Sequence, residues 1–150
     1  MKLLDDTNLS IVRQLKDGRK PFSQIATELG ITENTVRSRV NKMMEDGILD
    51  FQGLVDPQMM PDVQVIFMGL RFETRDLETK AKEILRLRGV LFATVVTGRY
   101  DIIAEIMLSD SRDFTLLDFF KKELVKITGI GGCETFVVYQ SHNLKVPFIL

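Results

Sequence analysis

The sequence has few of the residues that secreted and metal-binding proteins rely on. Its 150 residues include one cysteine, Cys133, and one histidine, His142. A single cysteine cannot form a disulfide within the chain, and one cysteine with one histidine argues against a Cys/His zinc site. We therefore expect no metal, no cofactor and a reducing, cytoplasmic setting.

Long apolar runs and a leader segment are also missing. The longest uncharged apolar stretch, Val63 to Leu70, is far shorter than the ~20 residues that a membrane helix needs. The N-terminal segment turns acidic at Asp5 and Asp6, which is not typical of a secretory signal. We expect no membrane span and no secretion.

The charge balance provides no bulk attraction for a polyanion. The net charge is −1, and residues 1–50 hold as many acidic as basic side chains. From Asn34 to Met44, however, there are three cations and no anion, which allows a local basic face. Apolar residues make up 45% of the chain and charged residues 27%, a balance that supports a folded core rather than disorder.

Glycine and proline divide the chain near residues 53–61. This segment contains one glycine and two prolines, and it separates halves of different hydrophobic periodicity. The first half has a helical period, and the second has strand-like runs that alternate with helical patterns. We expect one domain over residues 1–52, a linker over 53–61 and a second domain over 62–150.

Three helices and a short strand are predicted in the first half, over about residues 6–16, 21–29, 33–46 and 48–51. Gly30 supplies the turn between the last two helices, Ala26 lets them approach closely, and Val36 fills their junction. This order predicts a winged helix-turn-helix. The residues expected to face inward are Leu9, Ile11, Val12, Leu15, Ile25, Ala26, Leu29, Val36, Val40 and Met43.

The second half repeats a strand-helix-strand unit. Strands are predicted over residues 63–72, 91–97, 101–108 and 135–139, with helices over 77–88 and 113–127. The order βαββαβ is typical of a ferredoxin-like domain, so the fold class is α+β. The helix residues expected to face inward are Leu77, Ala81, Ile84, Leu85, Leu116, Leu117, Phe120, Leu124 and Ile127.

The predicted strands are apolar on both faces, although two helices can cover only one face of the sheet. In the first strand Val63, Val65 and Phe67 alternate with further apolar side chains. An exposed face of this kind would be a liability. We therefore expect a second copy of the chain to pack on it, which gives a homodimer.

Many positions of the first half agree with one family in residue type and spacing. They include Asp17-Gly18-Arg19, Ile25-Ala26, Leu29-Gly30-Ile31-Thr32, Thr35-Val36-Arg37, Arg39-Val40 and Gly47-Ile48-Leu49. They closely resemble the DNA-binding half of the Lrp/AsnC (feast/famine) transcription regulators. The second half is similar to that family's ferredoxin-like effector-binding domain through Gly98-Arg99-Tyr100-Asp101 and the glycines of residues 129–132. The resemblance implies a sequence-specific regulator of transcription that binds double-stranded DNA.

The third predicted helix carries the side chains that suit DNA. Amide, hydroxyl and guanidinium groups match base edges and phosphates in a major groove. We expect Arg37, Arg39 and Lys42 to contact phosphate or guanine. The full candidate set is Thr32, Asn34, Thr35, Arg37, Ser38, Arg39, Asn41 and Lys42. The alternative is an ordinary solvated helix face.

The glycine turn between two predicted strands is the candidate effector site. The resemblance implies that a small effector, usually an amino acid, binds near this turn between dimers, and so implies a larger even-numbered oligomer. The candidate residues are Gly98, Tyr100, Asp101, Gly132, Glu134 and Thr135, with residues 132–135 able to come from a neighbouring dimer. Asp101 would bind the ammonium group. The alternative is a plain hairpin in which Asp101 satisfies backbone donors.

Two other functions stay open. Siroheme-type tetrapyrrole decarboxylases look like this family in both halves, but they are expected to need several ionisable groups around a carboxylated substrate, and this chain has one histidine. The second is an effector-sensing subunit that does not bind DNA itself. We predict no catalytic residues, because nothing in the sequence indicates a nucleophile and the third helix suits DNA.

Overall fold

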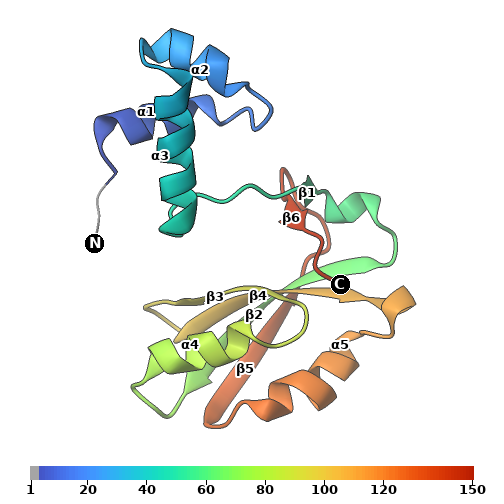
Figure 1. The fold of residues 1–150 in the computed structure, drawn as a ribbon. Helices are drawn as coiled ribbons and strands as arrows, with labels where there is room; N and C mark the ends of the chain where they lie inside the picture. Colours follow the sequence, from blue (N-terminus) through green and yellow to red (C-terminus); the bar gives the residue numbers. More distant parts are fainter. Residues whose placement is uncertain (1–3) are drawn as a thin grey trace. The chain divides into compact units, whose positions relative to one another are not determined.

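The computed structural model describes residues 4–150, which divide between two compact units (Figure 1). The chain up to Gln52 forms the first unit, and Gly53–Leu150 forms the second. Each unit has its own hydrophobic core. In the part of the chain that is described, no helix combines the length and hydropathy needed to cross a membrane.

Three helices form the first unit: α1 (Asp6–Gln14), α2 (Phe22–Leu29) and α3 (Glu33–Glu45). The predicted helices are confirmed, and so is the buried stripe of α3. One predicted inward residue, Leu9, is 38% exposed, because its neighbour Ile11 takes the buried position of α1. The core of the unit is built from Ile11, Ile25, Ala26, Val36, Val40 and Met43.

The turn between α2 and α3 has the geometry that the spacing predicts. Gly30 has a φ of +66°, in the left-handed region that favours glycine. The N–H of Ile31 donates to the carbonyl of Ala26 at 3.0 Å, which closes α2. Thr32 then caps α3 by accepting the N–H of Thr35. Together these bonds fix α3 against α2 as the second helix of a helix-turn-helix.

The strand predicted at residues 48–51 is wrong, and within the described residues no strand follows α3 in the first unit. The N–H groups of Ile48 and Leu49 both donate to the carbonyl of Met43, at 2.8 and 3.2 Å. Leu49 also packs against the core of the unit. These two N–H groups end helix α3 by bonding to its last turn, so they are not available to a partner strand. Within the described residues the helix-turn-helix therefore has no wing strand.

Four antiparallel strands form the main sheet of the second unit, in the order β3-β4-β2-β5. They are β2 (Val63–Phe72), β3 (Val90–Val95), β4 (Ile102–Ser109) and β5 (Ile130–Val137). The helix α4 (Leu77–Leu85) connects β2 to β3, and a helical segment that begins with α5 (Leu116–Asp118) connects β4 to β5. Both lie on the same side of the sheet (Figure 1). This is the predicted ferredoxin-like arrangement.

The second helical connection is not the continuous α-helix that the period predicts. After α5 the chain forms a π-helical turn (Phe119–Glu123) and a 3-10 turn (Leu124–Lys126). The change of turn width shifts the side chains around the axis, so Phe119 is buried while Leu117, predicted inward, is 60% exposed. Leu85 at the end of α4 was also predicted inward and is 50% exposed, because Ile84 takes the core position.

The last main strand begins five residues earlier than predicted. The predicted strand over residues 135–139 leaves the glycines of residues 129–132 outside the sheet, but β5 starts at Ile130 and Gly132 pairs with Arg71 of β2. Pairing with a long neighbouring strand overrides the weak strand preference of glycine. The shift moves Gly132 from a flexible loop into the sheet.

Residues 53–61, predicted to be a linker, contain β1 (Leu54–Val55) and a 3-10 turn (Pro57–Met59). β1 pairs with β6 (Val146–Pro147) near the end of the chain. Val146 packs against Val65 and Met107, on the side of the main sheet opposite the helices. The chain therefore covers part of the second sheet face with its own small sheet.

The rest of that second face is not covered by the described residues of the second unit. One row of paired residues crosses all four strands on this side. Phe92 and Phe136 at its two ends are 37% and 47% exposed. We call this region the open face and define it by Phe67, Phe92, Glu105 and Phe136.

Candidate functional site

The exposed face of α3 gathers five of the predicted DNA-contact residues. Asn34, Arg37, Ser38, Asn41 and Lys42 line one shallow surface depression together with Glu45. These positions recur every three or four residues, so they lie along one side of the helix. The side chains of α3 that are buried in the core are on the opposite side. The structure thus presents amides, a hydroxyl and two cations as one accessible stripe.

The other three predicted residues have roles within the unit. The Thr32 hydroxyl caps α3 and lies 2.8 Å from the Thr35 hydroxyl. Arg39 donates to Asp5 at 2.6 Å and to Asn8 at 2.9 Å, so the start of α1 holds its guanidinium group. The hydrogen bond from Arg39 lowers the pKa of Asp5. Arg39 is therefore outside the stripe and ties α3 to α1.

The cations of the stripe are paired within the chain. Arg37 Nη2 lies 2.7 Å from Glu33 Oε1, and the guanidinium carbon is 5.5 Å from the centroid of the Phe22 ring. Lys42 Nζ lies 2.7 Å from Asp46 Oδ1, and this bond raises the pKa of Lys42. The Arg37–Glu33 pair is half exposed and therefore weak. Each stripe cation therefore already has a carboxylate partner on α3 or directly after it.

The turn between β3 and β4 brings a second set of charged groups together within one chain. The Tyr100 hydroxyl donates to Glu134 Oε2, and Arg99 Nη2 lies 3.3 Å from the same oxygen. These side chains and Arg71 line a cavity of about 230 Å³ with Cys133. Two predicted effector residues, Tyr100 and Glu134, thus meet without a neighbouring dimer.

Sequence reasoning missed the two arginines of this cavity. Arg99 lies inside the glycine turn, but the predicted effector set includes only its neighbours Gly98, Tyr100 and Asp101. Arg71 lies near the end of the apolar strand β2, on the face of Phe67. A lone arginine at that position of an apolar alternation is a signal for a polar site at the edge of the open face. The guanidinium groups supply the positive charge that the predicted residue set lacked.

Two glycines make room for this cluster. A Cβ atom on Gly69 would lie 2.6 Å from the Tyr100 ring, so the ring rests directly on the backbone of β2. A Cβ atom on Gly132 would lie 2.7 Å from the Arg71 guanidinium group. Gly132, a predicted site residue, therefore contributes space. Gly98 has a φ of +133° and open space around its Cα, so its contribution is the conformation of the turn.

Asp101 and Thr135 are outside the lining of this cavity. Asp101 Oδ2 accepts the N–H of Phe72 at 2.8 Å, which ties the turn to the end of β2. This is the contact that the plain-hairpin alternative predicts. Thr135 pairs in register with Met68, whose side chain lies in the helix-covered core. Since paired residues share a face, the Thr135 side chain points away from Tyr100.

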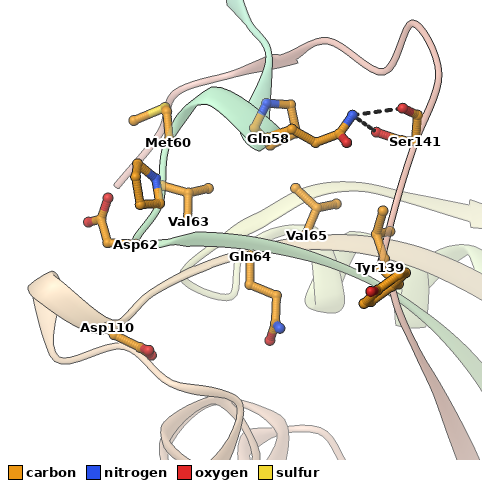
Figure 2. Close-up of a pocket in the computed structure, with 12 residues that line it drawn as sticks. Gln58, Met60, Asp62, Val63, Gln64, Val65, Asp110, Tyr139 and Ser141 are labelled. Atoms are coloured by element: carbon orange, nitrogen blue, oxygen red, sulfur yellow. Dashed lines mark hydrogen bonds between the residues drawn. The ribbon is translucent and has the colours of Figure 1, made fainter.

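A separate cavity of about 290 Å³ lies at the start of β2. Figure 2 shows Asp62 and Asp110 on one side of it and Ser141 on the other, where the Gln58 amide donates to Ser141 at 2.7 and 3.0 Å. The Ser111 hydroxyl donates to Asp62 and lowers its pKa. These bonds fasten the beginning of β2 to the surrounding loops. In the described part of the chain, no group of three acidic, cysteine or histidine side chains could hold a metal ion.

Two family models match the chain, one in each unit. The AsnC-type helix-turn-helix domain matches residues 4–44, and the Lrp/AsnC ligand binding domain matches residues 65–145. The first match contains the stripe of α3, and the second contains the cavity beside Tyr100.

Relatives of nearly the same length carry regulator names. An uncharacterized HTH-type transcriptional regulator of Pyrococcus furiosus is 32% identical over 91% of this chain and 92% of its own. The HTH-type transcriptional regulator Ptr1 of Methanocaldococcus jannaschii is 29% identical, with 93% and 94% covered. The solved structure of E. coli AsnC is 27% identical, with 93% and 95% covered and a TM-score of 0.66. These matches give the tetrapyrrole decarboxylase alternative no support.

Proposed function

The chain belongs to the Lrp/AsnC family of transcriptional regulators, and on that premise we propose that it is a sequence-specific, non-enzymatic regulator controlled by an amino acid or a related small molecule. Residues 1–52 form the DNA-binding domain, and residues 62–150 form the effector-binding and oligomerisation domain. The cytoplasm, where DNA and free amino acids meet, is its place of action.

The stripe of α3 is the observation that carries DNA binding. Its amides and its hydroxyl match the donor and acceptor pattern of base edges, and Arg37 can bind guanine through two parallel hydrogen bonds. Lys42 contacts a phosphate of the DNA backbone. The balanced charge of residues 1–50 limits the affinity of one domain, so useful occupancy needs two domains bound at once.

A homodimer supplies these two domains. The half-exposed Phe92 and Phe136 of the open face give a second copy an apolar surface to bury. A two-fold dimer presents two equivalent α3 helices, so the operator is an imperfect palindrome with half-sites one helical turn, or a multiple of it, apart. Dimers then associate into a larger even-numbered oligomer.

The cavity beside Tyr100 matches both charges of an amino acid. Arg71 and Arg99 supply guanidinium groups for an α-carboxylate, and Glu134 supplies a carboxylate for the α-ammonium group. Asp101 accepts the backbone N–H of Phe72 and so fixes the conformation of the turn beside this site. Because Asp101 is occupied by that bond, Glu134 is the partner of the ammonium group.

The cavity adjoins the surface that is proposed to pair two chains. The ring of Tyr100 lies edge-on to the ring of Phe136, with centroids 6.2 Å apart, and Phe136 belongs to the open face. A ligand at Glu134 and a second chain on the open face therefore touch neighbouring side chains. The ligand regulates assembly or DNA binding only as far as its affinity differs between the two states, typically ~1–3 kcal/mol.

Calorimetric titration of the twenty amino acids against the full-length protein tests the effector site. We expect at least one to bind, and Arg71→Gln to weaken it by tenfold or more because the carboxylate loses a charged partner. Arg86→Gln, an exposed arginine just after α4, is the matched control and is expected to bind like the wild type. No binding to the wild type at millimolar concentration would remove the amino-acid proposal and leave the DNA-binding half standing.

A further inference from the structure

One carboxylate lies in the middle of the open face. Glu105 of β4 is paired in register with Phe67 on one side and Phe92 on the other. The rings of these two phenylalanines approach to 6.4 Å between centroids although β4 runs between their strands. Between these two flanking rings Glu105 is only 6% exposed within the protomer.

This carboxylate lacks compensation inside the protomer. Among the described residues, Glu105 Oε1 has no hydrogen-bond donor. The neighbours on both flanking strands are aromatic, and on β4 itself the same face carries Ile103 and Met107. Burial raises the pKa of Glu105. A buried and unpaired charge is costly, whereas a buried neutral acid is much less so.

The charged groups on this side of the sheet include Asp56 and Lys145, which form an ion pair beside the small sheet of β1 and β6, and a second group at the far end of β2. Arg71 lies four residues beyond Phe67 on β2, roughly 13 Å along the strand, and it faces Glu134 of β5 across the cavity beside Tyr100. The strand β3 contributes no titratable group to this face. Among the described residues none of these charged groups donates a hydrogen bond to Glu105 Oε1, so its charge is not directly compensated.

We propose that, in the homodimer formed through the open face, Glu105 is buried as the neutral carboxylic acid, so that pairing of two chains takes up protons. The inference rests on the homodimer of the proposed function. A second copy is the occupant because the face is self-complementary: its phenylalanine side chains are apolar, and one end carries both signs of charge, at Arg71 and Glu134. In a two-fold symmetric dimer, Arg71 of each chain can lie opposite a Glu134 of the other chain.

The sign of the effect follows from linkage. A second copy removes the remaining water from around Glu105, so its pKa is higher in the dimer than in the free protomer. The dimer then binds more protons, and its dissociation constant falls as the pH falls between those two pKa values. Each Glu105 carboxyl group can change the dissociation constant of the dimer by at most about tenfold per pH unit. The two groups of a dimer together can change it by at most about 100-fold per pH unit. Outside that interval the dependence is flat.

Sedimentation equilibrium of the full-length protein between pH 5 and pH 8 tests the proposal. We expect the wild-type dimer to weaken at least tenfold as the pH rises across this range. Glu105→Gln, which is uncharged at every pH, is expected to dimerise as tightly as the wild type at low pH and to lose the dependence.

Two matched controls separate Glu105 from other groups. Glu78→Gln removes an 80% exposed carboxylate from α4, on the helix side of the sheet. His142→Gln removes the one histidine of the chain, which is exposed. Both variants are expected to keep the wild-type pH dependence. Its loss in His142→Gln would assign the proton to the histidine and overturn the role of Glu105.

Proton uptake by the wild type gives a readout that does not depend on a variant. Dilution calorimetry in two buffers of different ionisation enthalpy is expected to show proton release on dissociation near the middle of the range. A dimer with no proton release and no pH dependence would overturn the role of Glu105 while leaving the homodimer. A wild type and a Glu105→Gln variant that are both monomeric at micromolar concentration would instead overturn the homodimer of the proposed function.

Discussion

The ion pair between Glu33 and Arg37 is expected to restrain DNA binding, so Glu33→Gln should bind DNA more tightly than the wild type. The pair joins Nη2 to Oε1 at 2.7 Å on the side of α3 that we propose to face DNA, with side chains 55% and 45% exposed. In the wild type Arg37 leaves this partner before it reaches a base or a phosphate. The carboxylate then remains beside the DNA backbone.

The magnitude has two parts. An exposed ion pair at this i, i+4 spacing stabilises the free protein by about 0.3–0.5 kcal/mol. Breaking the pair subtracts this amount from the wild-type DNA affinity, and the Glu33→Gln variant has no such pair to break. Repulsion between a carboxylate and one phosphate at roughly 8 Å in water adds about 0.5 kcal/mol. Together they give about 1 kcal/mol, or roughly fivefold tighter binding. The variant also loses a favourable charge in the first turn of α3, which lowers stability by about 0.3–1 kcal/mol.

Fluorescence anisotropy with a labelled promoter fragment measures this change. Arg37→Ala is expected to lose about 1–3 kcal/mol and base preference, and in that background Glu33→Gln should gain only the repulsion part. Glu78→Gln breaks a comparable i, i+4 pair in the second unit and is expected to leave DNA affinity unchanged. A folded Glu33→Gln variant with wild-type or weaker affinity would refute this reasoning.

Substitutions at three further positions test the second unit. Gly89→Ala is expected to lower the free energy of unfolding by more than about 2 kcal/mol in urea titrations, because the residue has a φ of +81° and a Cβ would lie 2.5 Å from the Phe114 ring. Asp101→Ala should lower it by about 1–3 kcal/mol through the unpaired N–H of Phe72, whereas Asp101→Asn keeps an acceptor and should stay near wild type. Asp118 has a pKa held far below its usual range by a lysine one turn later and a threonine hydroxyl. Its stabilisation is therefore present above the ordinary pKa and lost as the pH falls, and Asp118→Asn should flatten that acid-side loss in thermal melts.

The first unit was largely predictable because its signals are local. The buried stripe of α3 repeats with the helical period, and Gly30 marks the turn before it. The missing wing strand was not predictable from residues 48–51, since an apolar segment forms a strand only if a partner strand is available. Here the carbonyl of Met43 takes the donors of Ile48 and Leu49 instead.

The candidate sites required contacts between distant residues. Arg71 and Glu134 are far apart in the sequence, and only the pairing of β2 with β5 brings them to one cavity. Asp101 had the right type and position for a ligand contact, but its partner is the N–H of Phe72 on another strand. Glu105 is one charged residue in an apolar run of sequence, and only the strand pairing places it between Phe67 and Phe92.

A footprint of the full-length protein on the DNA upstream of its own gene tests the central claim most directly, with wild type and Arg37→Ala side by side. The account predicts protection of two half-sites with centres about 10 bp, or a multiple of that, apart for the wild type. It predicts no protection by Arg37→Ala at the same concentration. Equal and sequence-independent protection by both proteins, or none by either, would contradict the account and favour an effector-sensing subunit that does not bind DNA.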